Sequence, residues 1–308
     1  MATEDVSARY QDLDAWGDLD ILKALYEGQL MAVAAIMPAL PQIAAAVAAA
    51  VPRLEAGGRL IYAGAGTSGR IGVQDGAELT PTFDWPEERL GFAIAGGDEA
   101  ILHAVENAED SVDDGADAMR RAGIGANDVV LGLAASGRTP YTLAAIAEAK
   151  ARGALTIGIA NNRGSALLEA GDHAILIETG EEVVAGSTRM KAGTAQKIVL
   201  NLFSTLLMIR MGRVYRGLMV HMRTTNAKLR HRAAQMVDMI TGCGIEAATR
   251  HLDRVGGDVK RAVLLAGGAG PEEAQALLDQ HRGNLRHALV ALDAGPGLGG
   301  QPARKAAP

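Results

Sequence analysis

Short runs of hydrophobic residues recur along the first two thirds of the chain, each ending in a small residue and followed by a segment of helical character. None of these runs alternates strictly between apolar and polar positions, as a strand exposed on one face does. Strands of parallel sheets lack that alternation because helices cover both faces. The pattern therefore predicts an α/β domain with a five-stranded parallel sheet, whose strands are residues 59–63, 90–95, 128–134, 154–160 and 174–177.

Helices are predicted between and after these strands from apolar residues that repeat at helical spacing. In the first part of the chain they span residues 98–121, 139–152 and 187–211, the last being long and mostly apolar. From about residue 231 the chain changes to short amphipathic segments separated by glycine, at 245–255, 258–265, 271–280 and 284–292. We expect these segments to form a small helical module of their own.

An uncharged stretch of 22 residues, 30–51, precedes the first predicted strand. About 20 apolar residues are enough to cross a bilayer. This stretch is nearly half alanine and contains Pro38 and Pro41, whereas membrane spans favour Leu, Ile and Phe with aromatic residues at their ends. We therefore expect a buried helical hairpin rather than a membrane span.

The chain is accordingly expected to have four parts. These are a helical N-terminal arm (1–50), an α/β domain (51–222), a helical C-terminal module (223–292) and a tail (293–308). The tail consists mostly of Gly, Pro and Ala, which leave little to bury, so it is predicted to be disordered.

Charge and cysteine content narrow the class of protein. Lys and Arg total 30 against 36 Asp and Glu, a net charge of -6, and no basic block marks a nucleic-acid surface. The single cysteine, Cys243, cannot form a disulfide within the chain, and the first residues lack the order of a signal peptide. The seven histidines are scattered without a metal-binding spacing. We expect a cytoplasmic protein with no metal, no nucleic-acid partner and no membrane contact.

A first glycine-rich loop, residues 64–70, follows a predicted strand and opens a helix. Its candidate binding residues are Gly66, Thr67 and Ser68, because glycine lets a ligand approach the backbone and the helix start supplies donors to an anion. The spacing is not that of a dinucleotide-binding fingerprint, and the Gly-Lys-Ser/Thr of a P-loop is missing. A tight connection with no ligand is the alternative.

A second loop, residues 134–141, also connects a predicted strand to a predicted helix. Ser136, Gly137 and Thr139 form a cradle of small hydroxyls and an amide suited to a phosphate monoester, and Arg138 adds positive charge. An ordinary helix N-cap is the alternative for these hydroxyls. Two such loops in one sheet favour a phosphate ligand.

These two loops resemble the sugar isomerase (SIS) domain, which binds phosphosugars. Longer stretches resemble the N-acetylmuramic acid 6-phosphate etherase family: GAGTSGRIGVQDGAELTPTF at 64–83, AGGDEAILHAVENAEDS at 95–111, ASGRTPY at 135–141 and EVVAGSTRMKAGTAQK at 182–197. The likeness covers about residues 50–290, and the C-terminal module is similar to the three-helix, ubiquitin-associated-like unit of these etherases. His221 and Glu181 depart from the family pattern.

The resemblance implies an enzyme, a carbon-oxygen lyase that cleaves the lactyl ether of N-acetylmuramate 6-phosphate in cell-wall sugar recycling. The products are N-acetylglucosamine 6-phosphate and D-lactate. In the open-chain sugar the lactyl oxygen on C3 is β to the aldehyde, so removal of the C2 proton gives an enolate that expels it, and water then adds. This chemistry requires a base, an acid and a hold on the phosphate, with no cofactor. The family likeness also implies a homodimer with shared active sites.

Two carboxylates match the family's catalytic positions. By that likeness Glu78 protonates the departing lactate and Glu109 acts as base at C2 and on water. Without the motif, a surface charge at a helix end is the favoured interpretation of Glu78, and Glu109 belongs to what could be one solvated acidic face. Glu106 lies three residues earlier on the same predicted helical face and is expected to be a supporting neighbour.

The predicted long helix opens with Ser187, Thr188, Arg189 and Lys191. Hydroxyls and positive charge there could hold the lactyl carboxylate or the phosphate; a capped helix with two surface cations is the alternative. We leave these residues out of the catalytic set.

Two other functions share these features. An aldose-ketose phosphosugar isomerase has the same fold and also removes a proton next to a carbonyl. A non-catalytic phosphosugar-binding regulator is the other, because the etherases also resemble the glucokinase regulatory protein. Such a regulator would carry two SIS domains and would not need both Glu78 and Glu109.

The distance between the first loop and Glu78 makes a further prediction. If one helix ran unbroken from Ser68 to Glu78, the carboxylate would lie about 15 Å from the ligand-binding end. Either Gly72 and Gly76 end the helix early, or Glu78 completes the pocket of a second subunit.

Overall fold

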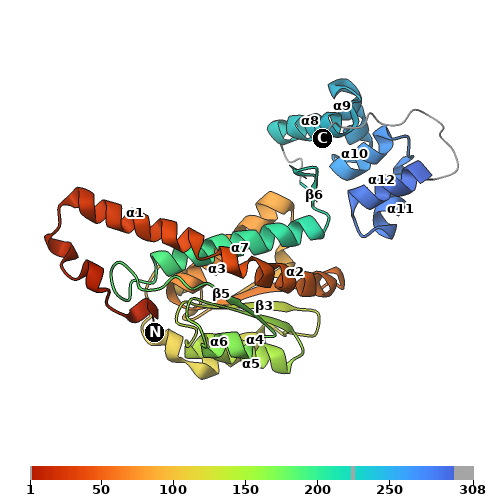
Figure 1. Ribbon diagram of the computed structural model, residues 1–308. Helices are drawn as coiled ribbons and strands as arrows, with labels where there is room; N and C mark the ends of the chain where they lie inside the picture. Colours follow the sequence, from red (N-terminus) through yellow and green to blue (C-terminus); the bar gives the residue numbers. More distant parts are fainter. Residues whose placement is uncertain (1, 223–225, 295–308) are drawn as a thin grey trace. The chain divides into compact units, whose positions relative to one another are not determined.

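The five predicted strands form one parallel sheet in the order β2-β1-β3-β4-β5 (Figure 1). The computed structural model describes residues 2–222 and 226–294. In it the strands are β1 (Leu60–Gly64), β2 (Leu90–Ile94), β3 (Val129–Ala134), β4 (Leu155–Ala160) and β5 (His173–Leu176). Every residue of β1, β3 and β4 is buried, which explains the missing alternation. The predicted α/β class is confirmed.

Helices cover both faces of this sheet. Figure 1 shows one group on one face, formed by α4 (Val112–Arg121), α5 (Pro140–Ala151) and α6 (Ala166–Ala170). The opposite face carries α2 (Leu40–Glu55), α3 (Gly66–Phe83) and α7 (Lys191–Arg210). On the α4/α5 face the core includes Ile61, Val130, Met119, Ala145 and Ile146. The predicted helix at 139–152 is confirmed as α5.

The helix predicted over 98–121 is wrong, because only its last ten residues, α4, are α-helical. Before α4 the chain makes two 3-10 turns, Gly97–Ile101 and Ala108–Asp110. Asn107 between them has a left-handed φ of 61°, and Ser111 caps α4 by accepting a hydrogen bond from the Asp114 N–H at 3.3 Å. Glu106 and Glu109 therefore do not share a helical face.

The long apolar helix α7 begins at Lys191 instead of residue 187. Its start is set by Glu182, whose carboxylate accepts hydrogen bonds from the N–H groups of Lys191 and Ala192, each at 2.9 Å. Glu182 is fully buried and precedes the helix by nine residues, so this cap comes from a turn that local spacing does not indicate.

The N-terminal arm does not form the predicted hairpin. Helix α1 (Asp18–Ala34) is followed by a 3-10 turn, Met37–Ala39, and then by α2, and Figure 1 shows the two helices following one another. Pro38 and Pro41 occupy first-turn positions, where proline is tolerated, so they do not reverse the chain.

The two helices of the arm differ in burial. Helix α2 buries Ile43, Val47 and Leu54 against the sheet. Helix α1 instead exposes more than half of several large apolar side chains, among them Leu19, Leu22, Tyr26, Leu30 and Met31. We refer to these five residues as the α1 apolar face.

By length and composition alone, Asp18–Glu55 and Lys191–Arg210 are apolar enough to cross a membrane. A buried core helix meets the same test. Helix α7 is of that kind, since Val199, Phe203 and Leu207 are fully buried.

The chain divides into two compact units between Leu207 and Met208. The second unit contains a short hairpin of β6 (Val214–Tyr215) and β7 (Leu218–Met219) and five helices in its described part. The helices are α8 (Ala227–Thr241), α9 (Ile245–Arg254), α10 (Val259–Ala266), α11 (Pro271–Gln280) and α12 (Leu285–Ala294). Helices α9 to α12 match the four predicted segments, and α8 was not predicted. The described part of this unit thus contains five helices where the family resemblance implied a three-helix module.

These helices pack around one apolar core that includes Val237, Leu252, Val263 and Leu278. The predicted tail is partly helical, because Asp293 and Ala294 belong to α12. The remaining residues of that tail, 295–308, lie outside the described residues, as do residues 223–225 at the predicted start of the module.

Candidate functional site

The two predicted loops meet at one edge of the sheet. Strands β1 and β3 are parallel neighbours, with Gly64 opposite Leu133, so the loops that follow them lie side by side. Together they line a cavity of about 390 Å³, which we call the loop cavity. Its lining includes all but one of the predicted binding residues: Gly66, Thr67, Ser68, Ser136, Arg138 and Thr139.

Gly137 is the predicted binding residue that does not line this cavity. It lies in the second loop with a left-handed φ of 65°, and a Cβ there would come within 2.2 Å of Ser165 Oγ. Glycine is therefore required at this position for the shape of the loop, whatever the ligand.

The helix ends at this cavity are open to an anion. Helix α3 follows Ala65, which offers no side-chain cap, so its first backbone N–H groups can bind a ligand. Thr139 occupies the N-cap position of α5, yet its side chain makes no capping hydrogen bond within the described part of the chain. Ser136 Oγ accepts a hydrogen bond from the Arg138 N–H at 3.2 Å, which bends the second loop. The alternative of an ordinary N-cap does not describe Thr139.

Glu109 lies at this site, in the 3-10 turn Ala108–Asp110. It is exposed and lines both the loop cavity and an adjoining cavity of about 290 Å³, which we call the side cavity. Glu106 lines the side cavity only. The structure thus brings Glu109 and the first loop together without a shared helix.

Arg70 anchors the segment that carries Glu109. Its guanidinium donates to the carbonyl oxygens of Ala100 at 2.9 Å and His103 at 3.0 Å. Since Arg70 also belongs to α3, directly behind the first loop, it ties the loop to the turn that positions Glu109. Sequence analysis placed Arg70 in the loop but gave it no role.

Glu78 lies away from the loop cavity. Helix α3 runs unbroken from Gly66 to Phe83, which excludes the alternative that Gly72 and Gly76 end it early. These glycines instead let the helix approach the sheet, because a Cβ at Gly76 would lie 2.5 Å from the Phe92 ring. Glu78 is exposed, about 15 Å along the helix from Ser68, and is absent from the lining of both cavities.

The residues around the start of α7 divide into two groups. Thr188 lines the loop cavity, before the helix begins. Lys191 is buried, with 4% of its surface exposed, and its Nζ donates to the Glu181 carbonyl at 2.6 Å. Burial lowers the pKa of Lys191, while Glu182 acts in the opposite direction. Lys191 is therefore neither a surface cation nor a residue of this cavity.

Sequence analysis missed Glu4 in the loop cavity and the buried carboxylate of Asp75, which lies further along α3 and lines neither cavity. Glu4 lines the loop cavity, and no local pattern marks it. Asp75, only 5% exposed, joins α3 to α7 by accepting hydrogen bonds from Asn201 at 2.7 Å and Ser204 at 3.1 Å. It also accepts one from the Tyr62 hydroxyl at 2.8 Å. Burial raises the pKa of Asp75, against the effect of these hydrogen bonds.

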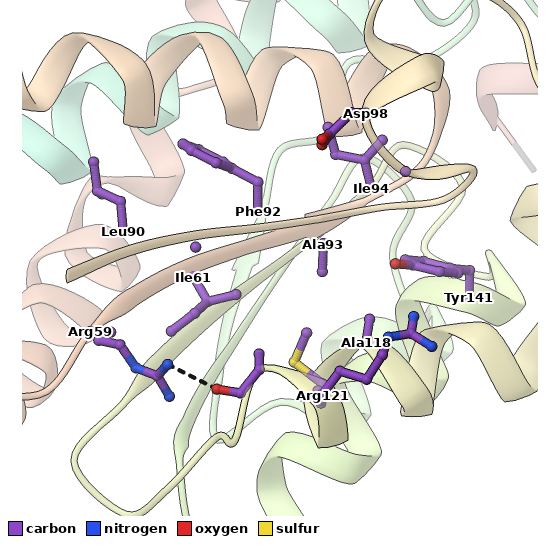
Figure 2. Close-up of a pocket in the computed structure, with 14 residues that line it drawn as sticks. Arg59, Ile61, Leu90, Phe92, Ala93, Ile94, Asp98, Ala118, Arg121 and Tyr141 are labelled. Carbon is purple, nitrogen blue, oxygen red and sulfur yellow. Dashed lines mark hydrogen bonds between the residues drawn. The ribbon is translucent and has the colours of Figure 1, made fainter. Parts of the chain in front are cut away.

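A separate cavity of about 220 Å³ lies between β2 and α4 (Figure 2). Arg59 at one end forms a salt bridge with Asp128 at 2.7 Å and donates a hydrogen bond to the Ala122 carbonyl oxygen at 2.8 Å. Tyr141 lies at the other end, where burial raises its pKa. The nine predicted site residues are all absent from its lining. Among the described residues, no cluster of His, Cys, Asp and Glu is arranged to hold a metal ion.

Comparison with known proteins places these features in a family. Residues 42–150 match the glucokinase regulatory protein N-terminal SIS domain, and residues 101–206 match the SIS domain. A protein of Deinococcus radiodurans named N-acetylmuramic acid 6-phosphate etherase is 51% identical over 93% of this chain and 94% of its own length. Proteins of the same name from Rubrobacter xylanophilus and Streptomyces avermitilis are 47% and 45% identical, each over 94% of this chain, and over 96% and 94% of their own lengths.

Among solved structures, a phosphoheptose isomerase from Francisella tularensis superimposes with a TM-score of 0.48 at 22% identity. The match covers 62% of this chain and 98% of that one.

Proposed function

The chain belongs to the N-acetylmuramic acid 6-phosphate etherase family, and we propose from this premise how its residues perform that reaction. The enzyme is a carbon-oxygen lyase that converts N-acetylmuramic acid 6-phosphate into N-acetylglucosamine 6-phosphate and D-lactate. The observation that carries this function is the likeness to etherases over nearly the whole chain. The loop cavity supports it, since it offers what a sugar phosphate requires.

The phosphate is proposed to lie between the two loops. The first-turn N–H groups of α3, the hydroxyls of Thr67 and Ser68, and those of Ser136 and Thr139 all line this cavity or open onto it. Hydroxyl and amide donors at helix starts stabilise a dianion, and Arg138 adds a positive charge at the rim.

Glu109 is proposed to be the base. With the phosphate held by the loops, C2 of the open-chain sugar lies within reach of a carboxylate on the wall of the same cavity. Glu109 takes the C2 proton, the C3–oxygen bond breaks as the electrons move from the enolate, and the lactyl oxygen receives a proton from Glu78. Glu109 then releases its proton to solvent, and Glu78 regains one from solvent. Water adds its oxygen to C3 and gives a proton to Glu109, which passes that proton to C2. Proton transfer of this kind contributes roughly 10² to 10⁴ to the rate.

Because Glu78 is far from the loop cavity of its own chain, we propose that it completes the site of a second subunit. The unbroken helix α3 supports this, since it holds the exposed Glu78 about 15 Å from Ser68. The α1 apolar face supports a homodimer as well, because five neighbouring side chains more than half exposed are costly to leave in water.

A cytoplasmic location is proposed with this function. The one cysteine, Cys243, is free, as expected in a reducing compartment. The net charge of -6 offers no attraction to nucleic acid, so the proposed partners are a phosphosugar and a second copy of the chain.

The direct test is incubation of the purified protein with N-acetylmuramic acid 6-phosphate, followed by an enzymatic assay for D-lactate. An etherase releases one lactate for each N-acetylglucosamine 6-phosphate formed. An aldose-ketose isomerase would change the sugar and release no lactate. A non-catalytic regulator would bind the phosphosugar and leave it intact.

A further inference from the structure

The segment around Thr3 is attached to the second loop by a hydrogen bond between residues far apart in the chain. Thr3 is fully buried, and its Oγ1 accepts a hydrogen bond from Asn162 Nδ2 at 2.9 Å. The same amide nitrogen donates to the carbonyl oxygen of Ala135, also at 2.9 Å. Ala135 directly precedes Ser136, so Asn162 joins this N-terminal segment to the loop that is proposed to bind phosphate.

Glu4 follows directly and reaches the loop cavity. It lines that cavity beside Thr67, Ser68 and Ser136. Its carboxylate also lies close to Gly186, where a Cβ would come within 3.1 Å of Glu4 Oε2. Gly186 has a left-handed φ of 73°, so glycine there both permits the turn and leaves room for the carboxylate.

The charges around the cavity limit what Glu4 can contact. Three of its described lining residues are acidic, Glu4, Glu109 and Asp110, and Arg138 is the basic one. The substrate carries two anionic groups, the phosphate and the lactyl carboxylate. A carboxylate repels both but accepts hydrogen bonds from neutral donors.

We infer that Glu4 is a specificity-determining residue that accepts a hydrogen bond from a neutral donor of the sugar, a hydroxyl or the acetamido N–H. This rests on the proposed function. Thr3 is a positioning residue, because its hydrogen bond to Asn162 sets where the Glu4 carboxylate enters the cavity. The sugar is then held between the phosphate loops and Glu4, with Glu109 on the same wall.

The test compares Glu4→Ala, Glu4→Gln and a control, Asp12→Asn, which removes an exposed acid of the same arm outside the cavity. Lactate kinetics and calorimetric binding of N-acetylglucosamine 6-phosphate are measured for each. Glu4→Ala should lower kcat/KM and product affinity by roughly 10- to 100-fold, the effect of losing a hydrogen bond to a charged acceptor. Glu4→Gln keeps a carbonyl acceptor and should fall between Glu4→Ala and wild type.

Two further ligands distinguish a direct contact between Glu4 and the sugar from an indirect effect of Glu4 on the two loops. Inorganic phosphate should bind Glu4→Ala as tightly as wild type or more tightly, because a repelling charge is removed. Glucose 6-phosphate lacks the acetamido group, so an equal loss of its affinity in Glu4→Ala identifies a hydroxyl as the donor, and an undiminished affinity identifies the acetamido N–H.

Thr3→Val should reproduce part of the loss of product affinity seen in Glu4→Ala. Thr3→Ser keeps the hydroxyl and should therefore keep the wild-type affinity. Wild-type product affinity and KM in Glu4→Ala would overturn the inference, as would an equal loss of phosphate affinity. If the wild-type protein released no lactate, the proposed function would fail, and the phosphosugar-binding comparison would still decide the role of Glu4.

Discussion

Asp75 is expected to be a main source of stability in the first unit, because it accepts hydrogen bonds from three side chains on two neighbouring elements. The donors are the Tyr62 hydroxyl on β1 and the side chains of Asn201 and Ser204 on α7, at 2.8, 2.7 and 3.1 Å. Replacing Asp75 with alanine leaves two buried donors, Tyr62 and Ser204, without their acceptor, together with the exposed Asn201 amide. Each such loss costs about 1 to 3 kcal/mol, and partial repacking reduces the sum, so we expect about 3 to 5 kcal/mol.

Glu78→Ala is a matched control, since it removes an exposed carboxylate from the same helix. It should change stability by less than about 0.5 kcal/mol, as exposed substitutions usually do. Both tryptophans, Trp16 and Trp85, belong to the first unit, so their fluorescence during urea unfolding reports on that unit. A loss below about 1 kcal/mol for Asp75→Ala, or one equal to that of Glu78→Ala, would refute this role for Asp75.

The Asp75 carboxyl group should also make the stability of the folded protein depend on pH. Burial raises the pKa of Asp75 above its usual 3.8, so its protonated form is favoured by folding. The contribution of this group to stability is then greatest below the unfolded pKa and declines as the pH rises through the folded pKa. Asp75→Asn lacks this titration, so its stability deficit relative to wild type should be smaller at pH 7 than at pH 4. An equal deficit at both pH values would contradict the raised pKa.

The remaining predictions concern the reaction. Glu78→Gln should lower the rate of lactate release by roughly 10²- to 10⁴-fold while exchange of the product C2 proton, followed by NMR, survives. Glu109→Gln should suppress both lactate release and exchange. Near-normal lactate release by both variants would remove these residues from the site and make Glu106 the next candidate. Mixing inactive Glu78→Gln and Ser136→Ala proteins under subunit exchange should restore up to about one active site per heterodimer; a fully active monomer would exclude the shared site. In heavy water the product should carry deuterium at C2, and oxygen-labelled water should mark the C3 hydroxyl and leave lactate unlabelled; label in lactate would mean displacement at the lactyl carbon.

The sheet and its two loops were predictable from the sequence because short stretches of neighbouring residues determine them. Runs such as 128–134 are apolar without alternation, and β3 is buried throughout. The glycines and hydroxyls that follow β1 and β3 lie next to each other because parallel neighbours end at the same edge. Glu109 was selected as a catalytic residue only through the family resemblance, and the helix inferred around it from spacing is absent.

Contacts between distant residues decided the rest. Glu182 sets the start of α7 by capping it from a preceding turn, and Arg70 holds the segment before Glu109 through backbone carbonyls. Gly72 and Gly76 resemble helix breakers in the sequence, yet they allow α3 to approach the sheet closely. The unbroken helix then carries Glu78 away from the loop cavity.

Glu4 was also beyond the reach of sequence analysis, because its position depends on a hydrogen bond between Thr3 and Asn162, 159 residues apart. Periodicity reports which face of an element is buried, and glycine reports where the backbone can turn. Neither reports which distant side chain caps a helix, anchors a segment or lines a cavity. That depends on the packing of the folded chain, where burial makes an unpaired polar group costly and so selects one partner.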